Sequence, residues 1–160
     1  MPLRLVLDTN VWLDWLVFDD AGVAPLKAAV AAEQAAIFID SACESELASV
    51  LAYRLRKEVL SATAQAACIA ECRRIARMVD SAAAFSAATT APSPTHVLPV
   101  CRDADDQKFL VLARDCRADF LVTKDLELLR LDRRKVRRAP FRIVTPAEFS
   151  AILATATTPS

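Results

Sequence analysis

Short apolar runs alternate along the chain with longer segments in which apolar residues recur every three or four positions. Runs of the first kind indicate buried strands, whereas the longer periodic segments indicate amphipathic helices. The strands predicted in this way cover 3–7, 35–39, 96–101, 120–122 and 141–144. Because strands and helices alternate, the pattern predicts an α/β fold built on a mainly parallel sheet of about five strands.

Polar residues at the borders of the apolar segments predict where helices begin. Ser41 and Glu44 have the spacing of a capping box, which makes Ser41 the predicted N-cap of a helix. Apolar positions continue at helical spacing from Thr63 to Val79, which predicts one long amphipathic helix. Residues 81–95 are mostly Ala, Ser, Thr and Pro, and we expect them to form an exposed connection.

The composition is that of one globular domain. The chain has 160 residues, 54% of them hydrophobic, and we expect a single domain over 1–155 and a disordered tail over 156–160. Twenty basic and twenty acidic side chains cancel, so any attraction to nucleic acid must be local. The five cysteines and one histidine lack the spacing of a zinc site, and no apolar run approaches the ~20 residues that span a bilayer. We therefore expect a cytoplasmic protein with reduced thiols and no membrane contact.

Acidic side chains follow the ends of several predicted strands. They are Asp8 after the first strand, Glu46 after the second, Asp103, Asp105 and Asp106 after the third, and Asp125 after the fourth. The carboxyl ends of parallel strands meet at one edge of a sheet, which is where open α/β sheets carry their functional sites. A purely structural interpretation also exists, because Asp103 can cap the following helix and Asp106 can complete a capping-box-like pair. Convergence at one edge favours a shared role.

Clustered carboxylates need a positive partner. Two like charges ~4 Å apart cost about 4 kcal/mol at an effective dielectric constant of 20, so a bare cluster destabilises the fold. A divalent cation removes this repulsion, and oxygen ligands without neighbouring histidine or cysteine favour Mg²⁺ or Mn²⁺. Such ions polarise phosphates and lower the pKa of bound water, which is the chemistry of phosphodiester hydrolysis.

With these residues assembled, the sequence resembles the PIN-domain family of metal-dependent ribonucleases, and most closely its branch of toxins from toxin–antitoxin pairs. The matching segments run along nearly the whole chain: Val6–Val11, Ser41 with Glu46, Arg102–Ala113, Leu121–Leu129 and Ile143–Phe149. The chain departs from the family in having a single glycine, Gly22, and an Ala/Ser/Thr/Pro-rich connection before the third acidic motif.

The resemblance implies a PIN-like three-layer α/β/α sandwich and assigns roles by position. The catalytic acids would be Asp8, Glu46, Asp106 and Asp125, and the metal ligands Asp8, Asp103, Asp106 and Asp125. Asn10 and Thr123 would orient Asp8 and Asp125 from behind. The expected partners are an RNA substrate, a cognate antitoxin protein and a second copy of the chain in a homodimer.

A basic run follows the fourth acidic position. It consists of Arg130, Arg133, Arg134, Lys135, Arg137 and Arg138. One interpretation is a solvated turn with Asp132 as a partial counter-charge. The other is an RNA-binding surface, formed by Arg133, Arg134, Arg137 and Arg138, that contacts phosphates without reading bases.

Other protein classes fit less well. A haloacid-dehalogenase-like phosphatase needs a second Asp two positions after Asp8, where this chain has Asn10. A phosphorelay receiver domain needs its acidic pair after the first strand and its phosphoacceptor after the third, which reverses the observed order. A PIN-like module that binds RNA or protein without cleaving it stays open as the alternative to an enzyme.

Overall fold

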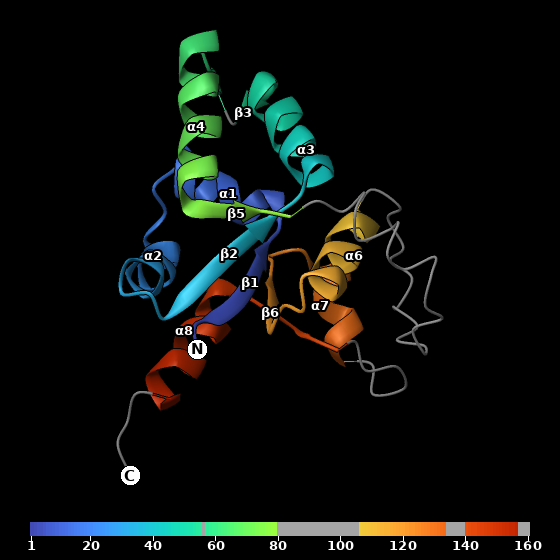
Figure 1. Ribbon diagram of the computed structural model, residues 1–160. Helices are drawn as coiled ribbons and strands as arrows, with labels where there is room; N and C mark the ends of the chain where they lie inside the picture. Colours follow the sequence, from blue (N-terminus) through green and yellow to red (C-terminus); the bar gives the residue numbers. More distant parts are fainter. Residues whose placement is uncertain (56, 80–105, 134–139, 157–160) are drawn as a thin grey trace.

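The computed structural model describes residues 1–55, 57–79, 106–133 and 140–156 (Figure 1). At its centre lies a sheet of five parallel strands in the order β5-β2-β1-β6-β7. The strands are β1 (Leu3–Leu7), β2 (Ala35–Ile39), β5 (Ala76–Met78), β6 (Phe120–Val122) and β7 (Arg142–Val144). The predicted α/β class with a mainly parallel, five-stranded sheet is therefore confirmed.

Strand β1 occupies the middle of the sheet. Leu5 pairs with Ile37 of β2 on one side and with Phe120 of β6 on the other. Leu5, Val6 and Leu7 are almost completely buried, because neighbouring strands and helices cover both faces of a parallel sheet. The end of β1 thus lies between the ends of β2 and β6, which positions the residues that follow all three strands close together.

Helices flank the sheet in a three-layer arrangement (Figure 1). α2 packs on β2 and against α8, whereas α6 packs on β1 and β6, and α3 packs against α1, α4 and α6. The helices are α1 (Thr9–Leu16), α2 (Ala24–Ala31), α3 (Ser41–Ala52), α4 (Ala62–Ile75), α6 (Gln107–Asp115), α7 (Leu126–Arg133) and α8 (Pro146–Ala156). A 3₁₀ turn, η1 (Ala21–Val23), precedes α2, and a small hairpin of β3 (Arg54–Leu55) and β4 (Glu58–Val59) follows α3. Within the described ranges, no helix has the length and apolar character needed to cross a membrane.

The helix predicted from Thr63 to Val79 is wrong at its C-terminal end, where the structure has a strand. α4 ends at Ile75, and Ala76–Met78 form β5, which pairs with Ile37–Ile39 at the edge of the sheet. A three-residue edge strand carries little periodic signal, and its buried Ala76 continues the helical spacing of the preceding apolar residues. The strand predicted at 96–101 and the connection predicted at 81–95 lie outside the described residues. So do residues 157–160 of the expected tail, whereas Ala156 is the last residue of α8.

The start of α3 also differs from the prediction by one residue. The N-cap is Asp40 rather than Ser41, and a carboxylate oxygen of Asp40 accepts a hydrogen bond from the Cys43 amide at 2.9 Å. Glu44 pairs with Arg73 of α4 at 2.7 Å instead of closing a capping box. Asp40 follows β2 directly and is buried, so its carboxylate already lies at the free amides of the helix.

Two helix ends are built with side chains where glycine is usual. Glu33 after α2 and Arg117 after α6 adopt left-handed backbone angles, with φ of 59° and 54°. Both ends form Schellman motifs, in which the amides of Glu33, Gln34, Arg117 and Ala118 donate to the carbonyls of Val30, Ala29, Arg114 and Ala113. The scarcity of glycine in this chain therefore does not prevent tight helix ends, although each non-glycine residue with left-handed backbone angles costs roughly 1 kcal/mol.

Candidate active site

Asp8 lies at the end of the central strand with both carboxylate oxygens engaged. It is the N-cap of α1, and one oxygen accepts from the Thr9 amide at 2.6 Å. The other oxygen accepts from the hydroxyl of Thr123 at 2.6 Å. The Asp8 amide in turn donates to the carbonyl of Val122 at the end of β6. A carboxylate that is only 5% exposed is therefore fixed in direction by the ends of two adjacent strands.

Burial raises the pKa of Asp8 above its ordinary value of 3.8. The hydrogen bonds from Thr123 and Thr9 stabilise the charged form and oppose this shift, while the negative charges of Asp125 and Glu46 add to it. Three acids that the sequence assigned to one site therefore interact electrostatically. A positive charge placed among them would relieve both the desolvation of Asp8 and its repulsion by its neighbours.

Thr123 connects Asp8 to Asp125. The hydroxyl of Thr123 donates to Asp8 and accepts a hydrogen bond from the Asp125 amide at 3.0 Å. The Asp125 carboxylate accepts from the Glu127 amide at 2.8 Å, and so caps the start of α7. One oxygen of the Asp125 carboxylate is thus bound by its own helix, while the Asp125 backbone is hydrogen-bonded to the residue that holds Asp8.

Glu46 extends from α3 toward the same region and is held by two other helices. The hydroxyl of Thr9, at the start of α1, donates to one of its carboxylate oxygens. The ammonium group of Lys108 in α6 lies 2.6 Å from the other oxygen. Both groups of this ion pair are largely shielded from solvent, with side-chain exposures of 23% for Glu46 and 25% for Lys108. A cation supplied by the chain therefore already lies beside one of the predicted catalytic acids.

The remaining predicted residues are placed unevenly. Asp106 is the N-cap residue of α6 and is half-buried, two residues before Lys108. Asp103 and Asp105 lie outside the described residues. Arg133 is the last residue of α7, and Arg134, Arg137 and Arg138 of the predicted RNA-binding run fall outside the described ranges, so that surface stays a prediction.

Asn10 contacts the turn that carries Asp125. Its side-chain oxygen lies 3.4 Å from the backbone nitrogen of Lys124, which donates to it. Asn10 therefore links α1 to the backbone beside Asp125, and Thr123 contacts Asp8 and Asp125 directly. That the two residues orient metal ligands stays a prediction.

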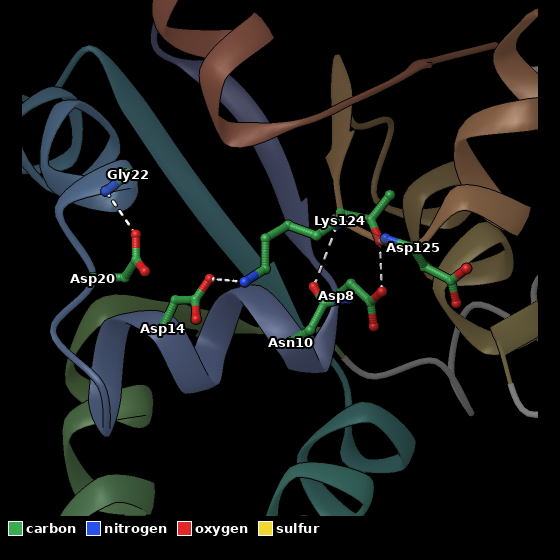
Figure 2. Close-up of polar contacts among 8 residues, drawn as sticks. Asp8, Asn10, Asp14, Asp20, Gly22, Lys124 and Asp125 are labelled. Carbon is green, nitrogen blue, oxygen red and sulfur yellow. Dashed lines mark hydrogen bonds and ion pairs between the residues drawn. The ribbon is translucent and has the colours of Figure 1, made fainter. Parts of the chain in front are cut away.

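Sequence reasoning missed a further contact in the same place. The ammonium group of Lys124 forms an ion pair with Asp14, whose side chain is only 4% exposed (Figure 2). The available signal was an aspartate in the middle of an apolar helix, Trp12-Leu13-Asp14-Trp15-Leu16. A charged side chain surrounded by apolar neighbours requires a partner of opposite charge, but the sequence does not say which one.

The donor chemistry of the site suits a hard divalent cation, because every candidate ligand is a carboxylate. Among the described residues, however, no group of three His, Cys, Asp or Glu side chains is arranged to hold a metal ion. Of the four predicted ligands, Asp8, Asp106 and Asp125 lie in the described ranges and Asp103 lies outside them.

A family model matches this chain in sequence, and a solved structure resembles it in fold. A sequence model of the family described as "PIN domain" matches residues 4–127. A solved structure of VapBC2 from Rickettsia felis, bound to a DNA fragment from their promoter, has a chain of similar fold with a TM-score of 0.57 and 14% sequence identity. The similarity covers 89% of this chain and 98% of that chain. No curated protein matches the sequence.

Proposed function

Because this chain belongs to the PIN-domain family, we propose that it is a Mg²⁺- or Mn²⁺-dependent endoribonuclease that hydrolyses RNA phosphodiester bonds. The observation that carries the proposal is the buried Asp8, whose pKa is raised by burial and by the negative charges of Asp125 and Glu46. A fold that keeps repelling carboxylates together at the end of its central strand favours a cation there. The proposed metal ligands are Asp8, Asp103, Asp106 and Asp125.

The side chains of the site have separable roles in this proposal. A bound divalent ion supplies charge neutralisation at the phosphate and lowers the pKa of water. Thr123 and the Thr9 amide hold the Asp8 carboxylate in one orientation, and Thr123 also fixes the backbone of Asp125. Glu46, held by Thr9 and Lys108, is proposed as a catalytic carboxylate that assists proton transfer.

Hydrolysis without a covalent intermediate is supported by the state of the cysteines. Burial raises the pKa of the Cys43 thiol far above its usual range, and raises the pKa of Cys72 to about 12 and of Cys116 to about 11. A thiol must ionise to act as a nucleophile, so these buried cysteines are inert near neutral pH. Cys43 lies three residues after Asp40 on the helix that carries Glu46, and its inertness agrees with water as the proposed nucleophile.

The biological role proposed is that of the toxin in a toxin–antitoxin pair. The fold resemblance to a chain of VapBC2, described with promoter DNA, supports a cognate antitoxin protein as a partner. We propose in addition that the protein acts in the cytoplasm as a homodimer.

The experiment that tests the activity is cleavage of single-stranded RNA in Mg²⁺ or Mn²⁺, compared with the same reaction in EDTA. Cleavage should need the metal and leave a 3′-hydroxyl and a 5′-phosphate. Asp8→Asn and Asp106→Asn should reduce the rate by orders of magnitude, since each removes a ligand charge while keeping the side chain's size. Glu148→Gln is the matched control. Glu148 accepts a hydrogen bond from the Thr145 amide at the start of α8, and the side-chain oxygen of glutamine can still accept it. Metal-independent cleavage, or wild-type rates in both Asn variants, would refute the assignment.

A PIN-like module that binds RNA or protein without cleaving it is the second candidate. The ion pair between Glu46 and Lys108 favours it, because a resident cation already satisfies part of the acidic cluster. Metal-independent RNA binding with intact RNA recovered after long incubation in Mn²⁺ would establish this alternative.

A further inference from the structure

We propose that Lys124 and Asp14 are positioning residues, whose ion pair holds the Asp125 turn against α1 and so sets Asp125 relative to Asp8. The inference rests on the proposed function for its catalytic meaning. The contact itself is a structural observation that can be tested separately.

Lys124 lies between two residues of the proposed site, in the segment that follows β6. It follows Thr123, which binds Asp8, and it precedes Asp125. From this turn its side chain reaches over α1 to the carboxylate of Asp14, while its backbone N–H donates to Asn10 (Figure 2). The turn is therefore attached to α1 at two points by one residue.

The two attachment points share a helix face with the start of the site. Asn10 and Asp14 are four residues apart, so they lie on the same side of α1, one turn above the other. Asp8 is the N-cap of this helix. Because a helix is stiff over so short a length, a residue bound to Asn10 and Asp14 has a fixed distance from Asp8 as well.

The burial of Asp14 makes this contact different from the ion pairs on the surface. The Asp14 side chain is 4% exposed, whereas Arg74 and Glu71, which pair along α4, are 71% and 42% exposed. Exposed pairs contribute little, but a buried carboxylate that loses its cation is left uncompensated. The Lys124 side chain is itself 47% exposed, but it carries the charge that compensates the buried Asp14. Lys124 is thus favoured in its observed place, and its backbone is held there with it.

Other supports of the Asp125 turn are short. β6 has three residues, Phe120–Val122, and the Thr123 hydroxyl accepts from the Asp125 amide. Among the described residues, the carboxylate and carbonyl of Asp125 accept only from amides of α7, the helix that follows it in sequence. A turn supported in this way can shift unless a side chain fixes it from another element. We infer that Lys124 provides that fixed point.

The first test measures geometry without any need for activity. Amide hydrogen exchange of Asp125 should become about tenfold faster in Lys124→Met, because the turn opens more often when its ion pair with Asp14 is lost. Lys124→Arg should restore most of the protection, and Arg74→Met, which breaks an exposed pair on α4, should change nothing. Unchanged exchange of the Asp125 amide in Lys124→Met would overturn the proposal.

Lys124→Met leaves Asp14 charged and buried, and this variant can fail to fold. The double variant Asp14→Asn with Lys124→Met removes both charges and avoids that cost. It should fold and still show the faster exchange at Asp125. Wild-type protection in a folded double variant would likewise reject the positioning role.

The second test measures RNA cleavage at a temperature where every variant is folded. Lys124→Met and the double variant should lose kcat by about tenfold to a hundredfold, with KM for RNA changed far less, since misplacement of a catalytic group lowers the rate more than the affinity. Lys124→Arg should recover most of kcat, and Arg74→Met should match the wild type. If the wild type cleaves RNA and kcat of Lys124→Met stays within about twofold of it, the positioning role is rejected while the proposed function stands. If the wild type does not cleave, the proposed function fails, and the exchange comparison alone decides whether the pair positions the turn.

Discussion

The hydroxyl of Thr123 lies 2.6 Å from a carboxylate oxygen of Asp8 and donates to it, although 115 positions separate the two residues in the chain. The same hydroxyl accepts from the Asp125 amide, so its proton can point only toward Asp8. One buried side chain therefore fixes an acid at the end of β1 and the backbone of a second acid after β6. This relationship is not visible in either sequence segment alone.

Replacing Thr123 by Val should damage both stability and activity. The substitution keeps the shape but leaves the buried Asp8 oxygen and the Asp125 amide without this partner, which costs about 1–3 kcal/mol of unfolding free energy. Thr123→Ser keeps the hydroxyl and should lose much less. Urea unfolding of the three proteins checks this, and equal stability of the Val and Ser variants would show that the hydroxyl contributes little.

Asp8→Asn should stabilise the metal-free protein near neutral pH while abolishing cleavage. Because the pKa of Asp8 is raised in the folded state, the folded protein holds this proton more tightly than the unfolded chain does. The contribution of Asp8 to stability is therefore best at low pH and falls as pH rises from about 3.8 through the raised pKa. The variant has no such loss, so its advantage in EDTA should appear at neutral pH and vanish toward acid pH. Unfolding curves across pH would contradict this if the advantage grew on acidification.

Millimolar Mn²⁺ or Mg²⁺ should raise the melting temperature of the wild type. An ion that binds only the folded state at ~100 times its Kd adds about 2.7 kcal/mol by mass action. Asp8→Asn should show a smaller shift, and Glu148→Gln the full one. Thermal melts with and without the ion, supported by calorimetry, provide the measurement, and a melting temperature that does not move would remove the metal site from the proposal.

Replacing Arg133, Arg134, Arg137 and Arg138 by Ala should weaken RNA binding equally for unrelated sequences. If all four side chains contact phosphates of single-stranded RNA, the slope of log K against log salt should become shallower by about 3. A double variant of Arg73 and Arg74 on α4 is the control for basic residues elsewhere. An unchanged slope in the fourfold variant would return the run to the solvated-turn interpretation.

Glu33→Gly and Arg117→Gly should each stabilise the protein by about 0.5–1 kcal/mol. Glycine relieves the strain of the left-handed backbone, and this gain exceeds the loss from the greater entropy of the unfolded chain. Glu33→Ala is the control, since alanine has the same strain and should bring no gain. Denaturant midpoints with unchanged m-values would establish the effect, and a gain in the alanine variant would point to the Glu33 side chain instead of the backbone.

Local patterns predicted most of the sheet. β1 and β2 have the predicted bounds, and β6 and β7 differ from prediction by one residue at most, because each is a short apolar run between polar turns. β5 was missed because an edge strand that buries one residue resembles the last turn of the helix before it. The general rule for parallel sheets predicted that Asp8 and Asp125 would lie at the same edge, whereas the pairing of their strands, β1 and β6, is known only from the structure.

The partners of the acids could not be predicted in the same way. Lys108 and Glu46 lie in α6 and α3, and Lys124 and Asp14 are separated by most of the chain. Each pair forms because the topology brings two surfaces together, and sequence spacing carries no trace of that contact. The metal site remains a prediction for a related reason, since one of its four predicted ligands, Asp103, lies outside the described ranges.

The central place of β1 has a consequence for the protein during its own synthesis. Chains fold from the N-terminus as they are made, so β1 and β2 are available long before β6. Until Phe120–Val122 emerges, one side of β1 is an unpaired edge, which favours contact with other chains or with chaperones. A nascent or truncated chain that ends before residue 120 carries Asp8 and Glu46 but neither Thr123 nor Asp125. The proposed chemistry can therefore arise only after the segment from Phe120 to Asp125 has been made and has folded onto β1.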